Sequence, residues 1–130
     1  MARPRSRHPT QVELEILKVV WRDGPSTVRQ VRDALAERRD LAYTSVMTMM
    51  TIMTDKGYLR RRKKGGSYVY RAKSSEGATK GGMLKDLMDR AFDGRPEAVM
   101  VNLLETSDLE AEELKRLRDL IDKKVKEEGR

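Results

Sequence analysis

The sequence LAYTSVMTMMTIMTDKGYLRRRKKGGSYVYRAK, residues 41–73, contains the pattern that decides the fold. In its first half, Val46, Met50 and Met53 recur at i, i+4 and i+7, the spacing of one buried face of an α-helix. A soluble helix normally exposes long charged residues, but the other side of this one carries short hydroxyl side chains, which can approach base edges and thymine methyl groups closely. These hydroxyl residues are Thr44, Ser45, Thr48 and Thr51.

The second half of the stretch predicts a basic β-hairpin. The helix ends at residues 55–57, where Gly57 can adopt the left-handed conformation that follows a helix. Two β-like segments within residues 58–72 then flank Gly65-Gly66, a dipeptide typical of a hairpin turn. We therefore predict a winged helix-turn-helix, with helix 43–56 in the major groove and hairpin 58–72 on the phosphates. The predicted DNA-binding residues are Tyr43, Thr44, Ser45, Thr48, Arg60, Arg61, Arg62, Lys63 and Lys64.

Two further helices are predicted before residue 41. Thr10 and Glu13 have the spacing of a capping box, and Thr27 and Gln30 repeat it. Apolar residues follow each box at helical spacing, so the winged helix-turn-helix should span residues 10–73. Trp21, the only Trp, is expected in the core rather than stacked on a ligand because it continues the first apolar stripe.

The charge is divided unevenly along the 130 residues, whose net charge is +7. Residues 1–73 hold 17 basic and 7 acidic side chains, whereas residues 74–130 hold 11 and 14. A basic half suits a polyanionic partner: DNA, RNA or an acidic membrane surface. Of these, the helix and hairpin pattern favours double-stranded DNA.

The composition argues against an enzyme and against a metal site. With no Cys, the chain has no disulfides, iron–sulfur clusters or thiolate ligands. His8 is the only His, and it is expected to be a solvated residue of a basic, flexible tail formed by residues 1–9. We therefore expect no cofactor, no metal and no catalytic residues. The methionines of helix 43–56 are expected to fill the core rather than to form a metal or ligand pocket. Met47 and Met49 cannot both point inward, so one of them is expected to contact DNA or a neighbouring helix.

The sequence contains no apolar run of membrane-spanning length and no signal-peptide core. We expect a cytoplasmic protein with no membrane partner. Residues 74–82, with Ser74-Ser75 and Gly81-Gly82, are polar and glycine-rich and are expected to form a flexible linker.

Residues 83–130 predict three helices with apolar faces. A unit of this size seldom buries enough apolar surface to be stable alone. We expect two copies to pack together as a homodimer, although packing of these helices onto the N-terminal domain is the alternative. The expected dimerisation residues are Leu84, Leu87, Met88, Phe92, Leu114, Leu117 and Ile121.

The sequence resembles the penicillinase-repressor family of winged-helix regulators, which includes the β-lactamase and methicillin-resistance repressors. The resemblance runs from about Gln11 to Val125. It is carried by LEILKVVW, TVRQVRDAL, AYTSVMTMMTIMTDKGYLRR, SYVYRA and FDGRPEAVMVNLLETSDLEAEELKRLRDLI, in that order.

The resemblance implies a mainly α fold with a small β wing, followed by a three-helix C-terminal dimerisation domain. It implies repression by a homodimer on palindromic operators, commonly with TACA/TGTA cores, read by the third helix and the wing. It also implies an inducing protease that cuts an Asn-Phe bond. The matching bond here is Asn102–Leu103, so the Phe is replaced. The Cys-rich tail of the copper-responsive branch is absent.

One alternative function is a non-specific, nucleoid-type nucleic-acid-binding protein without a regulatory role. The hydroxyl face of helix 43–56 favours a sequence-specific repressor, because a face of Lys and Arg would suit charge-driven binding better. A protein that only binds other proteins is a further alternative, but it would leave the basic hairpin unexplained.

Overall fold

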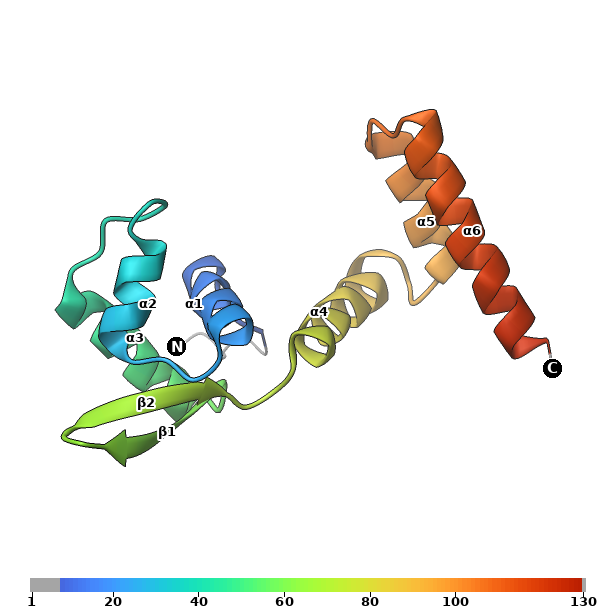
Figure 1. The fold of residues 1–130 in the computed structure, drawn as a ribbon. Helices are drawn as coiled ribbons and strands as arrows, with labels where there is room; N and C mark the ends of the chain where they lie inside the picture. The colour runs from blue at the N-terminus through green and yellow to red at the C-terminus, as the bar shows by residue number, and fades with distance from the viewer. Residues whose placement is uncertain (1–7, 130) are drawn as a thin grey trace, which may run out of the picture. The chain divides into compact units, whose positions relative to one another are not determined.

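The computed structural model describes residues 8–129 and confirms a mainly α fold with a small β wing (Figure 1). Three helices come first: α1 (Gln11–Asp23), α2 (Val28–Leu35) and α3 (Tyr43–Asp55). The antiparallel strands β1 (Leu59–Lys64) and β2 (Ser67–Ala72) follow, and we call this hairpin the wing. Three more helices complete the chain: α4 (Glu76–Ala91), α5 (Pro96–Thr106) and α6 (Ala111–Glu128).

The first two helices begin where their capping boxes predict. The Thr10 hydroxyl accepts a hydrogen bond from the Glu13 N–H, and the Glu13 carboxylate accepts one from the Thr10 N–H. Thr27 and Gln30 make the same reciprocal pair at α2. Each box satisfies N–H groups that a helix leaves unpaired at its start, which fixes the first residue of the helix.

The core of the N-terminal part joins α1, α2, α3 and the wing. Ser26 forms an isolated antiparallel bridge with Tyr70, so the segment between α1 and α2 pairs with β2 on the side away from β1. Trp21 packs against the core as predicted, and its indole N–H donates to the Ser74 carbonyl (2.9 Å). The buried apolar residues are Ile16, Leu17, Val19, Val20, Val28, Val31, Leu35, Val46, Met50, Met53, Leu59 and Tyr70.

The expectation of a flexible linker at residues 74–82 is wrong for most of that segment, because α4 begins at Glu76. The Ser75 hydroxyl accepts a hydrogen bond from the Ala78 N–H (3.1 Å), as an N-cap residue does. Glu76 and Lys80 add an i, i+4 ion pair (2.9 Å). The glycines that suggested a linker are tolerated inside the helix, although each costs about 1 kcal/mol relative to Ala.

The chain divides into two compact units, one ending at Leu84 and the other beginning at Lys85. The second unit contains the end of α4 together with α5 and α6, so the three predicted C-terminal helices are present. None of its described residues is buried. The N-terminal unit therefore has the only buried apolar core among residues 8–129.

Candidate nucleic-acid interface

Helix α3 presents a hydroxyl face to solvent and an apolar face to the core. Thr44, Ser45 and Thr48 are exposed, whereas Val46 and Met50 are fully buried. None of the hydrogen bonds within residues 8–129 uses the side chains of these three exposed residues. Their hydroxyl groups are thus available to a partner, and we call α3 the reader helix.

Other hydroxyl groups on the reader helix are satisfied locally. The Thr51 and Thr54 hydroxyls donate to the carbonyls of Met47 (2.9 Å) and Met50 (2.8 Å). Thr51, which the sequence pattern placed with the outward hydroxyls, is only half-exposed. The accessible hydroxyls are therefore concentrated in the first two turns of α3. That end carries no acidic residue and has no side-chain cap at Ala42, which makes it receptive to an anion.

A groove of about 600 Å³ lies between the reader helix, the start of α2 and the wing. Tyr43, one of the predicted DNA-binding residues, lines it, and Arg29 and Arg32 supply positive charge from α2. Met47, one of the two methionines that cannot both point inward, lines the groove and is exposed. Tyr68 was not predicted, but it also lines the groove and is exposed. Alternation along β2 could have identified Tyr68, because it lies two residues from Tyr70 and so on the same face, and Tyr70 also lines the groove.

The wing divides the five predicted basic residues between two faces. The register pairs Arg61 with Tyr70 and Lys63 with Tyr68, and directly paired residues share one face of a hairpin. Arg60, Arg62 and Lys64 alternate with them and so belong to the other face. The basic run predicted as a single phosphate-binding set is therefore two sets pointing in opposite directions.

Arg61 is held in place by aromatic side chains. Its guanidinium carbon lies 4.3 Å from the centre of the Tyr68 ring, within the range of a cation–π interaction. A hydrogen bond with the Tyr70 side chain raises the pKa of Arg61. Arg61 is thus oriented before any partner binds, which reduces the conformational entropy that it loses on binding.

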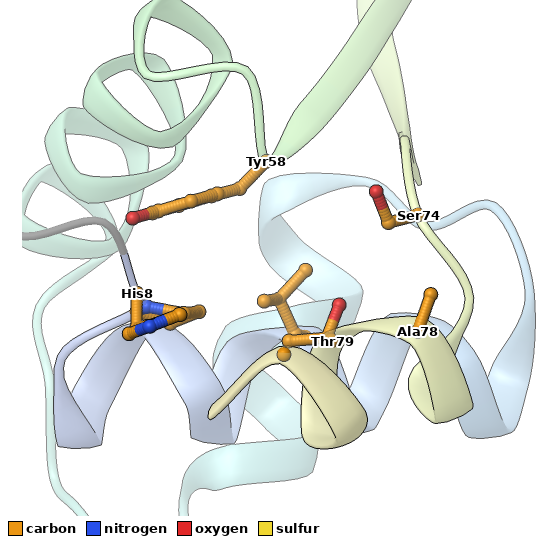
Figure 2. A pocket seen from close by; sticks show the side chains of 8 residues that line it. His8, Tyr58, Ser74, Ala78 and Thr79 are labelled. Atoms are coloured by element: carbon orange, nitrogen blue, oxygen red, sulfur yellow. The ribbon is translucent and has the colours of Figure 1, made fainter. Parts of the chain in front are cut away.

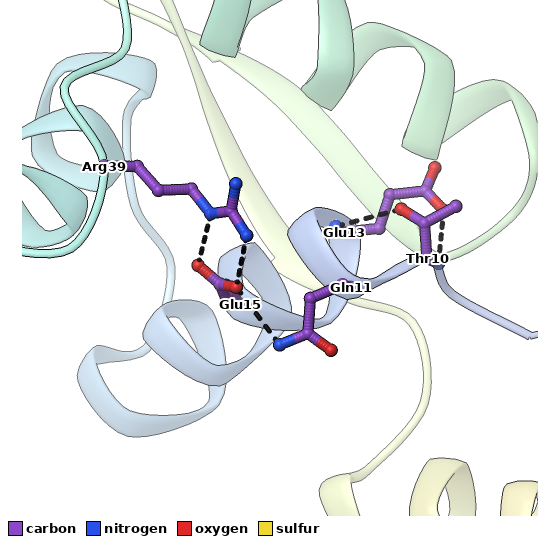
Figure 3. Close-up of polar contacts among 5 residues, drawn as sticks. All are labelled: Thr10, Gln11, Glu13, Glu15 and Arg39. Atoms are coloured by element: carbon purple, nitrogen blue, oxygen red, sulfur yellow. Dashed lines mark hydrogen bonds and ion pairs between the residues drawn. The ribbon is translucent and has the colours of Figure 1, made fainter.

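Two buried carboxylates on α1 anchor the segments on either side of the reader helix. The Glu15 carboxylate accepts two hydrogen bonds from Arg39, from Nε (2.9 Å) and Nη2 (3.1 Å), just before α3 (Figure 3). The Glu13 carboxylate accepts one from Lys56 Nζ (2.9 Å), just after α3. The segments on both sides of the reader helix are therefore tied to α1 by ion pairs, a constraint that favours one orientation of the helix on the core.

The surroundings of both carboxylates lower their pKa. Burial alone would raise the pKa of Glu13, but the hydrogen bond from the Thr10 N–H and the charge of Lys56 outweigh it. For Glu15 the Arg39 hydrogen bond is the largest cause, and Gln11 adds another. Both groups are thus ionised more readily in the folded chain than in an unfolded one.

The lowered pKa of the two carboxylates predicts that the fold becomes less stable in acid. A carboxylate with a lowered folded pKa stabilises the fold above its ordinary value of 4.5, and that contribution fades as the pH falls through the lowered value. We expect the urea midpoint, followed by Trp21 fluorescence, to fall between pH 7 and about pH 3.5. The double variant Glu13→Gln, Glu15→Gln should be less stable at pH 7 and show a flatter pH dependence. Glu37→Gln, at an exposed acid, is the control, and parallel curves for wild type and double variant would contradict the assignment.

A cavity of about 210 Å³ lies between α1, Tyr58 and the start of α4 (Figure 2). His8 lines this cavity and is half-buried, so the prediction of a solvated tail residue is wrong for it. The local reason is that Pro9 and Thr10 lead directly into α1, which brings His8 against Tyr58 and Thr79. The rest of the predicted tail, residues 1–7, lies outside the described residues. The cavity shares no residue with the reader helix.

The residues expected to form a dimer interface are accessible in the single chain. Leu84, Leu87, Leu114 and Ile121 are 42–57% exposed, and Met88, Phe92 and Leu117 are half-buried.

The bond between Asn102 and Leu103 lies inside α5, and the Asn102 carbonyl accepts a hydrogen bond from the Thr106 hydroxyl (2.7 Å). A protease would have to open this helix locally. Cleavage there stays a prediction.

Within residues 8–129, no helix combines the length and the apolar composition needed to cross a bilayer. No group of three or more His, Asp or Glu side chains is arranged to hold a metal ion in that part of the chain.

The amino-acid sequence is similar to those of known proteins over most of the chain. The sequence profile described as penicillinase repressor matches residues 9–123. The transcriptional regulator BlaI of Mycobacterium tuberculosis is 32% identical over 96 residues, which cover 72% of this chain and 70% of that protein. The methicillin resistance regulatory protein MecI of Staphylococcus aureus is 21% identical over 115 residues, 88% of this chain and 94% of MecI.

Among solved structures, the chain is similar to the Bacillus licheniformis BlaI monomeric form in complex with the blaP half-operator. The TM-score is 0.48 and the identity 25%, over 56% of this chain and 89% of the other. The extent of the profile match, together with the identity to the mycobacterial regulator, settles the family. The chain belongs to the penicillinase repressor family.

Proposed function

We propose that this chain is a sequence-specific, DNA-binding transcriptional repressor that acts as a homodimer on a palindromic operator. The observation that carries the proposal is the exposed face of the reader helix, where Thr44, Ser45 and Thr48 have no hydrogen-bond partner within residues 8–129. Short hydroxyl side chains can donate to or accept from base edges, and their methyl or methylene groups can contact thymine. The family, and the similarity to the methicillin resistance regulatory protein MecI and the transcriptional regulator BlaI, support the same proposal.

In this proposal the reader helix lies in the major groove and the wing contacts phosphates. Arg61 and Lys63 belong to the wing face that also carries Tyr68, and Tyr68 lines the groove shared with α2 and α3. A phosphate strand that follows this groove would meet Arg29 and Arg32 from α2 and Arg61 from the wing. Such contacts set affinity and register, whereas the threonine and serine hydroxyls read the sequence.

The homodimer is supported by the second unit, none of whose described residues is buried. Leu114, Leu117, Ile121 and Val125 follow each other at i, i+3, i+7 and i+11 along α6, and Ile121 and Val125 are 50% and 63% exposed. A second copy of the chain offers the same stripe, so two copies can cover it reciprocally about a two-fold axis. A two-fold dimer in turn requires an operator with two inverted half-sites.

A non-specific, nucleoid-type protein is the second candidate, and the excess of ten positive charges in residues 1–73 favours it. Charge alone, however, gives binding that depends on salt and not on base sequence. The two candidates differ in what they predict for a neutral residue of the reader helix.

Thr48→Ala is expected to weaken binding to the specific site by about 1–3 kcal/mol and to leave binding to random duplex nearly unchanged. Thr48 is exposed, so its methyl and hydroxyl can be removed without disturbing the core. The measurement is a competition titration of fluorescent site duplex against unlabelled random duplex. Thr51→Ala is the matched control, because the Thr51 hydroxyl is bonded within the helix. Equal losses on both duplexes would make Thr48 a phosphate contact and would favour the non-specific candidate.

A further inference from the structure

The side-chain sulfur of this chain belongs to methionine alone. The sequence contains 8 Met and no Cys, so the thioether is the one sulfur group that an oxidant can attack. Among residues 8–129, Met47 is the only exposed methionine, and it is 40% exposed. An oxidant must reach the sulfur to react with it, so Met47 should react before the methionines that the fold covers.

The other methionines are covered to different degrees. On the reader helix, Met50 and Met53 are fully buried, and Met49 is half-buried and packs against the core. Met1 lies outside the described residues. The described methionines beyond the reader helix are all half-buried: Met83, Met88 and Met100. The reader helix therefore exposes one thioether and holds its other three wholly or partly out of water.

Met47 lies where oxidation would matter for the proposed function. It lines the groove of about 600 Å³ between the reader helix, α2 and the wing, together with Tyr43 and Tyr68. In the sequence it follows Thr44 by three positions and directly precedes Thr48, and both threonines are proposed to contact bases. DNA that occupied the groove would exclude water from Met47. An apolar thioether loses little on leaving water, so the unmodified side chain suits this position.

We propose that Met47 is a modification site and that its oxidation by hydrogen peroxide releases the protein from DNA. The inference rests on the proposed function. The thioether sulfur donates an electron pair to one peroxide oxygen, the O–O bond breaks, and the leaving hydroxide takes the proton of the transferred oxygen to become water. The sulfur is oxidised to the sulfoxide and the peroxide is reduced by the same electron pair, so no further reactant is needed.

The sulfoxide opposes DNA binding because it is polar and has no proton to donate. Phosphate oxygens and many base-edge atoms of the major groove are hydrogen-bond acceptors as well, so DNA offers the sulfoxide oxygen few partners. If Arg29 or Arg32 bonds the sulfoxide instead, that arginine is diverted from phosphate. Covering one such polar group without a good partner should weaken binding by about 10-fold or more.

The experiment treats the full-length protein with graded hydrogen peroxide and stops the reaction with catalase. Peptide mass mapping measures the oxidation of each methionine, and a titration with the specific duplex measures binding in the same sample. Met47 should be oxidised first, and the affinity should fall by about 10-fold or more as its sulfoxide accumulates. Methionine sulfoxide reductases for both epimers should restore binding. The thermal midpoint should stay unchanged, because Met47 is outside the buried core.

Three variants assign the effect to one side chain. Met47→Leu removes the thioether at nearly the same volume, so its affinity should not respond to peroxide when compared with its own untreated sample. Met49→Leu is the matched control and should respond as wild type does, because it keeps Met47. Met47→Gln carries a polar acceptor permanently and should bind the specific duplex weakly before any treatment. In wild type, prior binding of the specific duplex should slow the oxidation of Met47.

Three outcomes would overturn the proposal. Oxidation of Met47 no faster than that of Met50 and Met53 would show that its exposure does not select it. Loss of affinity by treated Met47→Leu, as large as in wild type, would place the effect at another residue. Full binding by protein whose Met47 is a sulfoxide would show that the modification has no consequence. In each case untreated wild type would still prefer the specific duplex to random DNA, whereas failure of the proposed function would abolish that preference before any oxidant is added.

Discussion

Glutamate in place of Leu117 or Ile121 is expected to convert the proposed homodimer into monomers and to weaken binding to the proposed operator by about 10²–10⁴-fold. Both residues belong to the apolar stripe of α6, and Ile121 is 50% exposed in the single chain. A charge there remains in water in the monomer but would be desolvated without a partner in a dimer. The loss of affinity follows because two joined reader helices bind with an effective concentration that separate monomers lack.

Analytical ultracentrifugation at micromolar concentration checks this prediction. Wild type should sediment with twice the 15.0 kDa mass of the chain, and the variants with that mass. Lys123→Glu, on the polar side of the same helix, should remain dimeric. Monomeric wild type under these conditions would contradict the proposed architecture, as would dimeric Leu117→Glu and Ile121→Glu proteins that bind the operator normally.

The second large effect concerns Met50, which anchors the reader helix to the core. Met50 is fully buried, and its removal leaves a cavity beneath the hydroxyl face. We expect Met50→Ala to lower the free energy of unfolding of the N-terminal unit by about 2–5 kcal/mol. Met50→Leu nearly conserves volume and should cost less than about 1.5 kcal/mol. Since native domains are stable by only about 5–15 kcal/mol, the alanine variant should also lose much of its DNA binding at elevated temperature.

Urea unfolding followed by Trp21 fluorescence measures this cost, because the only Trp of the chain packs against the same core. Met47→Ala is the matched control: Met47 is on the same helix but is 40% exposed and lines the groove beside the wing. It should unfold close to wild type. A similar loss of stability in the two alanine variants would show that the buried face of α3 has been assigned incorrectly.

Much of the N-terminal unit could be predicted from the sequence because its signals are local. The two capping boxes set the starts of α1 and α2, and the spacing of Val46, Met50 and Met53 identified the buried face of α3. Gly65-Gly66 marked the hairpin turn, where both residues have positive φ. Each of these features involves residues within a few positions of each other, so the pattern in the chain and the contact in space coincide.

The missed features depend on contacts between residues distant in sequence or on competing local preferences. Glu13 meets Lys56 across 43 positions, and no periodicity indicates such a pair. Gly81 and Gly82 suggested a linker, but the Ser75 cap and the helix that follows outweighed their low helix propensity. The division of the wing into two basic faces required the strand register, which the run of basic residues hides.

Genomic footprinting of the full-length protein tests the central claim most directly. The proposal predicts discrete protected sites, each containing two inverted half-sites whose centres are about one helical turn, roughly 10 base pairs, or a multiple of it apart. Protection at those sites should be lost in Thr48→Ala at protein concentrations that still protect them in Thr51→Ala. Uniform, salt-sensitive protection across the chromosome, with no recurring inverted sequence, would contradict the account and identify a non-specific nucleic-acid-binding protein.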